Sequence, residues 1–374
     1  FWVSAAVLVH NYFGLYFILR LVGGRLRSVP DPPDEKLPTV TVIVPAHNEE
    51  ALISARIDNL LRQKYPSDKL NIVVGSDDST DETVGIVRRY ATHGVEVVEM
   101  PERRGKLGVI DTLAPRARGE VVAITDANVS FAETGLRNLV RRFTDPKVGV
   151  AGGNLRLIPP SDEARVDREV SYRSFETRLK EAMSRQGRLI GVYGGFYAFR
   201  RALFRPLGER PCHDDVIIPL EVLAQGYESV FAGDAEAVEP TDATIRGEFR
   251  RRVRLAAFNY LTLPRLARLA LRAGWFTTFI AFSYKVTRWL SPFIIAALMA
   301  STLVLADVHP FYALVAMLFG LAAAAALIGA GADLLGMNAG LATAAYHFGM
   351  MNIAGALGLV RLVKGFQRFW TPRN

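Results

Sequence analysis

The hydrophobic pattern divides the chain into a central stretch of ordinary globular character and two apolar ends. Residues 1–22 form a mostly apolar run of about the length that spans a bilayer. Apolar residues concentrate again from about residue 275 to residue 363, whereas residues 30–250 alternate short apolar runs with polar segments. The pattern predicts a folded α/β domain between membrane-associated helices.

Within the central stretch, β-branched runs alternate with helical segments. Residues 40–45 form a tight apolar run, typical of a parallel strand that is buried on both faces. The further predicted elements are strands at residues 71–75, 95–100 and 120–125 and helices at residues 50–63, 106–117 and 216–224. This alternation predicts a Rossmann-like, mostly parallel, doubly wound sheet with right-handed crossovers.

Polar clusters follow three of the predicted strands, at Asn48 and Glu49, at Asp77, and at Asp126 and Asn128. In a doubly wound sheet, ligands bind at the carboxyl ends of the strands. One such cluster would be an ordinary turn or helix cap, but three at one edge favour a nucleotide site. The glycine-rich dinucleotide fingerprint is absent after the first strand, which disfavours a Rossmann oxidoreductase.

The apolar C-terminal part contains three candidate spans, at residues 289–306, 310–331 and 339–363. Residues 274–284 are too short to span, and we expect them to lie in the membrane plane. Together with the N-terminal run this predicts four spans and an integral membrane protein of a bacterial inner or plasma membrane.

Basic residues indicate the orientation. Arg20, Arg25 and Arg27 follow the N-terminal run where a signal peptide would have a small-residue cleavage site, so we expect an anchor and a cytosolic domain after it. Four spans would then leave the basic tail, residues 365–374, outside, although the same rule predicts it inside. The sequence leaves this conflict open.

Charge and cysteine content exclude several classes of protein. The net charge is +8, but many of the basic residues flank apolar segments, which is typical of membrane proteins and disfavours nucleic acid as a partner. The single cysteine, Cys212, excludes an intrachain disulfide, and no Cys/His cluster of the kind that binds zinc is present.

Five motifs in order carry a family resemblance. They are Val-Pro-Ala-His-Asn-Glu-Glu at 44–50, Ser-Asp-Asp-Ser-Thr-Asp at 76–81, Arg-Gly-Lys at 104–106, Thr-Asp-Ala-Asn at 125–128 and His-Asp-Asp at 213–215. Over about residues 38–260 this order resembles the membrane-bound family 2 glycosyltransferases, which have the GT-A fold. The stretch that begins Lys285-Val-Thr-Arg-Trp is similar to the membrane portion of the cellulose, hyaluronan and poly-N-acetylglucosamine synthase branch.

The resemblance implies five regions along the chain. They are an N-terminal transmembrane helix at 1–23, a GT-A domain at 38–245, amphipathic interfacial helices at 246–288, C-terminal transmembrane helices at 289–364 and a basic tail at 365–374.

The resemblance also implies where a nucleotide-sugar donor binds. The donor-binding residues it implies are Pro45, Asn48, Glu49, Asp77, Lys106, Asp126, Arg251 and Arg254. Carboxylates accept hydrogen bonds from uracil N–H groups and ribose hydroxyls, and guanidinium groups bind diphosphate oxygens in a bidentate way. The alternative for the arginine run at 246–254 is a basic helix face against anionic lipid headgroups.

Asp126 and Asn128 correspond to the family's Asp-x-Asp motif, which implies a divalent metal, Mg²⁺ or Mn²⁺, between them and the diphosphate. Asn128 replaces the second carboxylate with a neutral amide, so we expect weaker metal binding.

An acidic pair supplies the general base in this family, which implies that role for Asp215 with Asp214 as its neighbour. A like-charged neighbour raises the pKa of a carboxylate, which suits proton uptake. The alternative is a helix N-terminus with two favourable acids. Phe196 and Tyr197 correspond to the segment that contacts the acceptor, or else form a plain strand.

The predicted function is inverting transfer of a sugar from a nucleotide diphosphate, expected to be UDP, to a lipid-linked or polysaccharide acceptor at the bilayer. Leu255 stands where processive members have the Trp of Gln-x-x-Arg-Trp, which favours single addition, whereas three C-terminal spans favour a processive synthase that exports its polymer. A nucleotide-sugar-binding protein without activity is a further alternative. A secondary transporter would need more spans and more intramembrane charges.

Overall fold

The computed structural model describes residues 1–24, 29–158, 175–240, 245–335, 337 and 339–364. Across these residues, eight strands form one mixed sheet in the order β3-β2-β1-β4-β7-β6-β8-β5. The four predicted strands are confirmed as parallel neighbours: β1 (Val40–Ala46), β2 (Leu70–Ser76), β3 (Val95–Glu99) and β4 (Val121–Thr125). The other four are β5 (Ser130–Phe131), β6 (Val148–Ile158), β7 (Phe196–Arg200) and β8 (Glu228–Pro240).

The strand order changes direction at β1. From β1 the chain adds β2 and β3 on one side and then returns to place β4 on the other side. Loops that leave the carboxyl ends of β1 and β4 therefore diverge, which is where open α/β sheets bind ligands. Every residue of β1 and β4 is buried, as the β-branched runs predicted.

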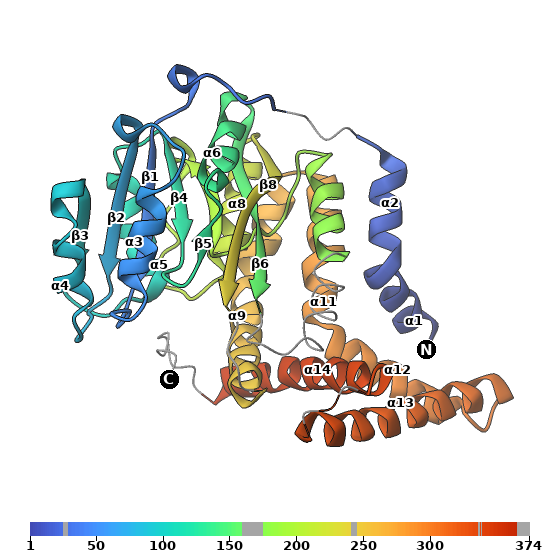
Figure 1. The fold of residues 1–374 in the computed structure, drawn as a ribbon. Coiled ribbons are helices and arrows are strands. Elements are labelled where there is room, and N and C mark those ends of the chain that lie inside the picture. Colours follow the sequence, from blue (N-terminus) through green and yellow to red (C-terminus); the bar gives the residue numbers. More distant parts are fainter. Residues whose placement is uncertain (25–28, 159–174, 241–244, 336, 338, 365–374) are drawn as a thin grey trace.

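Helices cover both faces of the sheet (Figure 1). One face packs against α3 (Ile53–Leu61) and α6 (Gly135–Val140), and the other against α5 (Gly105–Leu113) and α8 (Asp214–Ala224). The core beneath α5 and α8 continues into side chains of the terminal helices, among them Leu15, Leu19, Leu266 and Leu269. The sheet and the terminal helices thus share one hydrophobic core.

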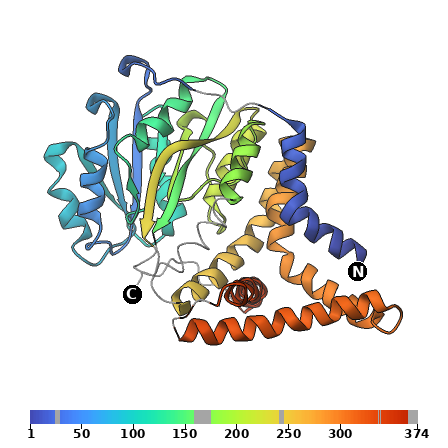
Figure 2. The same cartoon turned by 45° about the vertical axis from the view of Figure 1, so that its right-hand side comes forward.

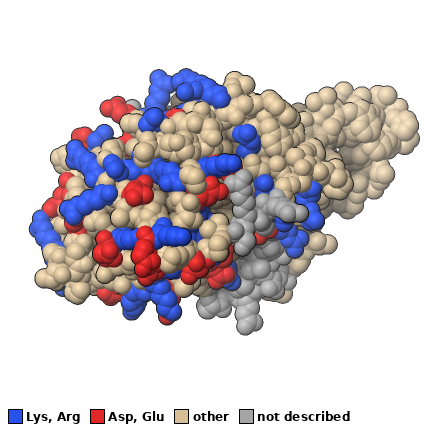
Figure 3. Space-filling model, turned by 90° about the horizontal axis from the view of Figure 1, so that it is seen from above, with Lys and Arg blue, Asp and Glu red and all other residues tan. Residues whose placement is uncertain are grey.

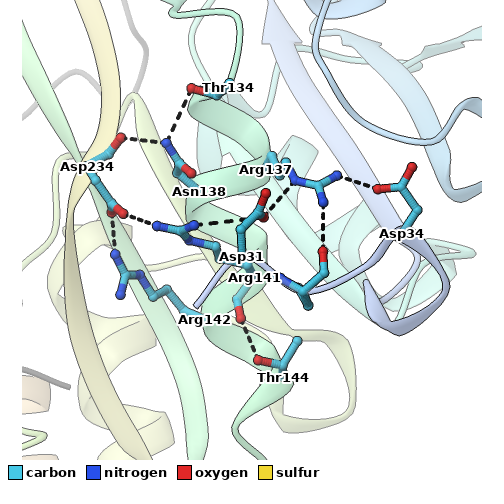
Figure 4. A network of polar contacts seen from close by, with 10 residues as sticks. Asp31, Asp34, Thr134, Arg137, Asn138, Arg141, Arg142, Thr144 and Asp234 are labelled. Atoms are coloured by element: carbon cyan, nitrogen blue, oxygen red, sulfur yellow. Dashed lines mark hydrogen bonds and ion pairs between the residues drawn. The ribbon is translucent and has the colours of Figure 1, made fainter. Parts of the chain in front are cut away.

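The N-terminal apolar run is a continuous helix made of α1 (Trp2–Val9), a π-helical turn (His10–Gly14) and α2 (Leu15–Val22). A polar network shown in Figure 4 holds the chain that follows it. Arg137 of α6 donates to Asp31 Oδ1 (2.8 Å), Asp34 Oδ1 (2.6 Å) and Pro32 O (2.7 Å). The connection to β1 is therefore fixed against α6.

The C-terminal helices are α9 (Ile245–Arg272), α10 (Trp275–Ala281), α11 (Thr287–Trp289), α12 (Ser291–Leu305), α13 (Pro310–Leu334) and α14 (Leu341–Val363). A π-helical turn at Phe282–Val286 joins α10 to α11. Figures 1 and 2 show α13 and α14 side by side, beyond the end of α9. Tyr260 of α9 donates to Gly355 O of α14 (2.8 Å), which ties the two helices where they cross.

Among the described residues, two helices are long and apolar enough to cross a membrane: Trp2–Val22 and Pro310–Leu334. The pair Trp275–Trp289 and Ser291–Leu305, bent by 68°, is a third candidate if it counts as one span. Of the four predicted spans, the one at residues 339–363 is not among these candidates: it corresponds to α14, which carries His347, Asn352 and Arg361. The number of spans stays a prediction. In Figure 3, charged side chains gather over the sheet domain, while the protruding end bears few of them. The basic tail, together with Arg25 and Arg27, lies outside the described residues.

Candidate active site

The turns that follow β1 and β2 brace each other at the carboxyl edge of the sheet. Asn48 and Asp78 both adopt positive φ, 54° and 58°, which Asn and Asp tolerate better than most residues. Asn48 Oδ1 accepts from the backbone N–H of Thr80 (2.8 Å), and the backbone N–H of Glu49 donates to Thr83 Oγ1 (2.8 Å). Asn48 and Glu49 can thus belong to an ordinary turn and to a nucleotide site at the same time, because these bonds hold both residues at the carboxyl edge of the sheet.

Asp77, at the end of β2, clamps the start of α5. Its carboxylate accepts from the backbone N–H groups of Arg104 (2.7 Å) and Gly105 (2.8 Å), and its side chain is almost fully buried. Gly105 has a φ of 73°, which glycine adopts without strain. Asp77 therefore fixes the backbone that carries Lys106, and direct contact with the nucleoside stays a prediction.

Lys106 links the site's carboxylates. Its Nζ donates to Asp126 Oδ1 (2.7 Å) and to Gly194 O (2.8 Å). Burial alone would lower the pKa of Lys106, but the nearby carboxylates of Asp126, Asp214 and Asp215 outweigh burial and raise this pKa. A β-carbon added at Gly194 would lie 3.7 Å from Lys106 Nζ and 3.8 Å from Asp215 Cβ. Lys106, Asp126 and Asp215 therefore meet around Gly194, as the converging motifs predicted.

The two carboxylates that begin α8 have different surroundings. Asp214 Oδ2 accepts from the hydroxyl of Tyr197 (2.7 Å). Burial and the charge of Asp215 raise the pKa of Asp214, while Lys106 opposes the rise. The side chain of Asp215 lies beside Gly194 and is 24% exposed, so a ligand can reach it. Both residues of the pair are partly exposed, and Asp214 is the one that Tyr197 holds.

His213 attaches this pair to the C-terminal helices. Its backbone N–H donates to Thr262 Oγ1 of α9 (3.0 Å). Its ring lies 5.8 Å from the ring of Phe258 and 5.9 Å from that of Trp289, centroid to centroid. Sequence reasoning missed Trp289 as a neighbour of the acidic pair, because the only signal was its position directly before an apolar run.

The predicted metal ligands form a small oxygen-rich set. Asn128 Nδ2 donates to Glu239 Oε1 (3.2 Å), and Glu239 is buried at the end of β8, 111 residues further along the chain. Glu239 was missed because no motif surrounds it. In the part of the chain that is described, no group of three or more His, Cys, Asp or Glu side chains could hold a metal. The carboxylate of Asp126 and the carbonyl of Asn128 suit a hard cation that takes its other ligands from phosphate oxygens and water.

Three of the predicted site residues, Pro45, Phe196 and Tyr197, are buried within strands of the sheet. Pro45 is buried inside β1 and pairs with Gly75 of β2, so it shapes the strand end. Phe196 and Tyr197 are fully buried in β7, and Tyr197 donates to Asp214, which agrees with the alternative of a plain strand. Contact of these residues with the acceptor stays a prediction. Aromatic residues in a strand with both faces covered are core residues.

Arg251 and Arg254 lie in the first half of α9. Their assignment to the nucleotide stays a prediction.

Known proteins resemble this arrangement. Residues 41–208 match the family described as Glycosyl transferase family 2. "Probable glycosyltransferase YdaM" of Bacillus subtilis (strain 168) is 27% identical over 248 residues, which is 62% of this chain and 58% of that protein. "Beta-monoglucosyldiacylglycerol synthase" of Nostoc sp. is 31% identical over 135 residues, which is 35% of this chain and 29% of that protein.

A solved structure resembles nearly the whole chain. It is the mannosyltransferase PcManGT from Pyrobaculum calidifontis in complex with GDP-Man and Mn²⁺, with 27% identity and a TM-score of 0.69. The likeness covers 97% of this chain and 99% of that one. It confirms the predicted GT-A-type fold, and the matched segment holds Asp77, Lys106 and Asp126. Residues 41–208 are therefore similar to a family 2 glycosyltransferase domain.

Proposed function

We propose that this protein is an inverting glycosyltransferase that moves a sugar from a nucleoside diphosphate, with UDP as the first carrier to test, to a membrane-associated acceptor. One observation carries the proposal. Lys106 joins Asp126 of the metal motif to Gly194, against which the accessible carboxylate of Asp215 lies. A group for donor phosphates and a group for proton removal are thus adjacent.

In the proposed reaction, Asp215 takes the proton of an acceptor hydroxyl while that oxygen attacks the anomeric carbon. The bond from the anomeric carbon to the phosphate oxygen breaks, and the nucleoside diphosphate leaves with the electron pair. Attack from the side opposite the leaving group inverts the anomeric centre, so an α-linked donor gives a β-linked product. Asp214, held by Tyr197, keeps α8 and Asp215 oriented.

Charge on the departing diphosphate needs stabilisation. Lys106 supplies one positive charge at this edge of the sheet. Mg²⁺ or Mn²⁺ held by Asp126 and Asn128 would supply further charge neutralisation when bound. Arg251 and Arg254 are proposed to contact the same phosphates from α9.

The membrane setting is part of the proposal. Candidate spans lie before and after the sheet domain, and α8 packs against α9, which leads into them. This arrangement favours an acceptor carried in the bilayer and a catalytic domain on the cytosolic side.

A donor panel tests the proposal. Protein reconstituted in lipid would be incubated with UDP- and GDP-linked hexoses and N-acetylhexosamines, with Mg²⁺ or Mn²⁺ and a membrane lipid extract. We expect one nucleoside diphosphate to be released and a glycolipid or polymer of inverted anomeric configuration by NMR. A product that retains the donor's configuration would contradict the mechanism, and absence of release with every donor would favour a binding protein without activity.

Product length decides between the two forms of this activity. A labelled product with one added sugar identifies single addition, in keeping with Leu255 in place of the Trp. A ladder of long products identifies a processive synthase.

A further inference from the structure

A second charged cluster lies near Asp215, and the proposed chemistry does not use it. Lys180 belongs to the helix at residues 175–184, and Lys285 and Arg288 belong to the segment around α11. These three cations surround a single carboxylate, Glu176. We call these four residues the cationic cluster.

Contacts within the cationic cluster are close. Lys180 is 1% exposed, and its Nζ lies 3.6 Å from Glu176 Oε1 and 4.0 Å from the centre of the Tyr193 ring. Tyr284 donates its hydroxyl to Glu176 Oε1 (3.1 Å), and its ring faces the guanidinium of Arg288 at 5.1 Å. The cations thus lie together in a largely buried place.

The cationic cluster has an excess of positive charge. Burial would raise the pKa of Glu176, but Lys180, Lys285 and Arg288 together lower it, so this carboxylate stays ionised. Burial lowers the pKa of Lys180 to about 8, with Lys285 adding to the fall and Glu176 opposing it. The charge of Asp215 also acts on Lys180 and Lys285, so two carboxylates, Glu176 and Asp215, face three cations among the described residues. Buried charge without a counter-ion is unfavourable, so the place suits an anion.

The loop through Gly191 connects the cationic cluster to Asp215. Gly191 O accepts from Lys180 Nζ (2.9 Å), and a β-carbon on Gly191 would lie 2.8 Å from Lys285 Nζ. The next residue, Val192, donates its backbone N–H to Asp215 O (2.9 Å). An anion held by these lysines would therefore lie near Asp215, the proposed general base.

A buried amide offers a further donor. Asn11, in the π-helical turn of the N-terminal helix, is 1% exposed and accepts from Arg288 Nε through its Oδ1 (3.3 Å). Its Nδ2 is buried and has no hydrogen-bond partner among the described residues. A phosphate oxygen is an acceptor that would satisfy such a donor. Because Asn11 and Arg288 belong to candidate spans, the cationic cluster lies between the sheet domain and the apolar helices.

We propose that Lys180, Lys285 and Arg288 bind the phosphate of a lipid-linked acceptor and so hold the attacking hydroxyl of that acceptor at Asp215. This inference rests on the proposed function and narrows the acceptor class to an anionic lipid. A neutral lipid acceptor would leave the positive charge uncompensated. Phosphate on a soluble acceptor has the same chemistry, and the experiment below separates the two sources.

Binding of short probes tests the site. The full chain in phosphatidylcholine nanodiscs would be titrated by calorimetry with citronellyl phosphate, with neutral citronellol and with inorganic phosphate. We expect citronellyl phosphate to bind and citronellol not to bind. The variant Lys285→Met weakens citronellyl phosphate binding by about tenfold or more, and Lys285→Arg restores it to within about threefold, because the charge and not only the packing is required. A matched control, Arg272→Gln, removes an exposed charge at the end of α9 and leaves the affinity unchanged.

Several outcomes overturn the inference. Equal binding of citronellol, unchanged affinity in Lys285→Met, or displacement of the probe by UDP would exclude a phosphate site at the cationic cluster. If inorganic phosphate binds as tightly as citronellyl phosphate, the lipid chain contributes nothing to binding. The site would then fit a soluble phosphorylated acceptor and not a lipid. Release of nucleoside diphosphate from donor, measured in parallel, keeps the two proposals apart. If the donor is turned over but citronellyl phosphate does not bind, only the proposed anion site is contradicted. If citronellyl phosphate binds in a way that depends on Lys285 but no donor is turned over, only the proposed glycosyltransferase activity is contradicted.

Discussion

The two sides of Asp215 are built in opposite ways. On the proposed donor side, carboxylates and backbone groups from consecutive strand ends converge, and Asp77 alone accepts two backbone N–H groups at the start of α5. On the proposed acceptor side, the cationic cluster brings together the helix at 175–184 and the segment around α11, and Arg288 of the cluster donates to Asn11 of the N-terminal helix. The donor side is therefore rigid and local in sequence, whereas the acceptor side depends on how the terminal helices dock.

This difference suggests that one side of the site binds the nucleotide and the other binds the acceptor headgroup. Backbone clamps suit a nucleotide, whose shape is the same for every sugar it carries. Long cationic side chains suit a headgroup that arrives from the bilayer, since they attract phosphate and adjust to its position. Changes on the donor side should then affect turnover and folding together, and changes on the acceptor side should affect acceptor binding alone.

The largest effect is expected at Lys106. Lys106→Met removes the ammonium that Asp126, Asp214 and Asp215 share, so nucleoside diphosphate release should fall by about 100-fold or more. Lys64→Met, which removes an exposed ion pair with Glu133, should keep release within about twofold. Full turnover in Lys106→Met would remove Lys106 from the donor side.

Asp77 tests the rigidity of the donor side. Asp77→Asn replaces one acceptor oxygen with an N–H donor that faces a backbone N–H, so the free energy of unfolding should fall by ~3 kcal/mol. Thermal denaturation in detergent measures the loss as a lower Tm. Asp68→Asn, at an exposed position, is the matched control. Equal Tm values for the two variants would mean that the clamp contributes nothing to stability.

Asn128 tests the metal interpretation. Asn128→Asp places a second carboxylate against Glu239, so the metal-free Tm should fall. Mn²⁺ should then raise the Tm more than in the original protein, with a several-fold tighter apparent affinity, because two carboxylates bind a hard cation better than one. Asp126→Asn should abolish the Mn²⁺-induced rise. A Tm that Mn²⁺ leaves unchanged in every variant would contradict a divalent metal at this place.

The smallest effect is expected for substitution of Asp214, which should raise the Tm instead of lowering it. Its pKa is raised in the folded protein, chiefly by burial and by Asp215. A carboxyl with a raised pKa contributes stability below its unfolded pKa, about 3.9, and this contribution is lost as the pH rises through the folded pKa. Asp214→Asn should therefore raise the Tm by about 1–3 °C at pH 7, with the gain fading in acid.

Asp214→Ala is the control for this prediction. Alanine leaves the hydroxyl of Tyr197 without its acceptor, so this variant should lose stability. If the Tm of Asp214→Asn at pH 7 were below that of the original protein, it would contradict the conclusion that the ionised carboxylate of Asp214 destabilises the fold.

The same contrast explains what could be predicted from the sequence. The strands β1, β2 and β4 were predicted because β-branched runs and the turn residues after them are local patterns. The positions of Asn48, Asp77 and Asp126 at one edge followed from the parallel topology. Lys106 could be read as part of the Arg-Gly-Lys motif.

The rest depended on contacts that no local pattern encodes. Glu239 reaches Asn128 only through the pairing of β8 beside β5, and Lys180 meets Lys285 only when distant helices pack. Phe196 and Tyr197 were assigned to the acceptor because they lie between two motifs; the sheet buries them on both faces, and their contact with the acceptor stays a prediction. The sequence pattern predicted that α14 spans the membrane, but α14 is not among the candidates by length and composition.

The variant Asp215→Asn tests the central claim most directly. Initial rates of nucleoside diphosphate release would be measured for this variant and for Asp68→Asn, with nucleotide affinity measured by calorimetry on the same preparations. Loss of the proton acceptor should lower the rate by about 100-fold or more while the nucleotide affinity stays within about threefold. A rate in Asp215→Asn equal to that of Asp68→Asn would contradict Asp215 as the base, and with it the two-sided site described above.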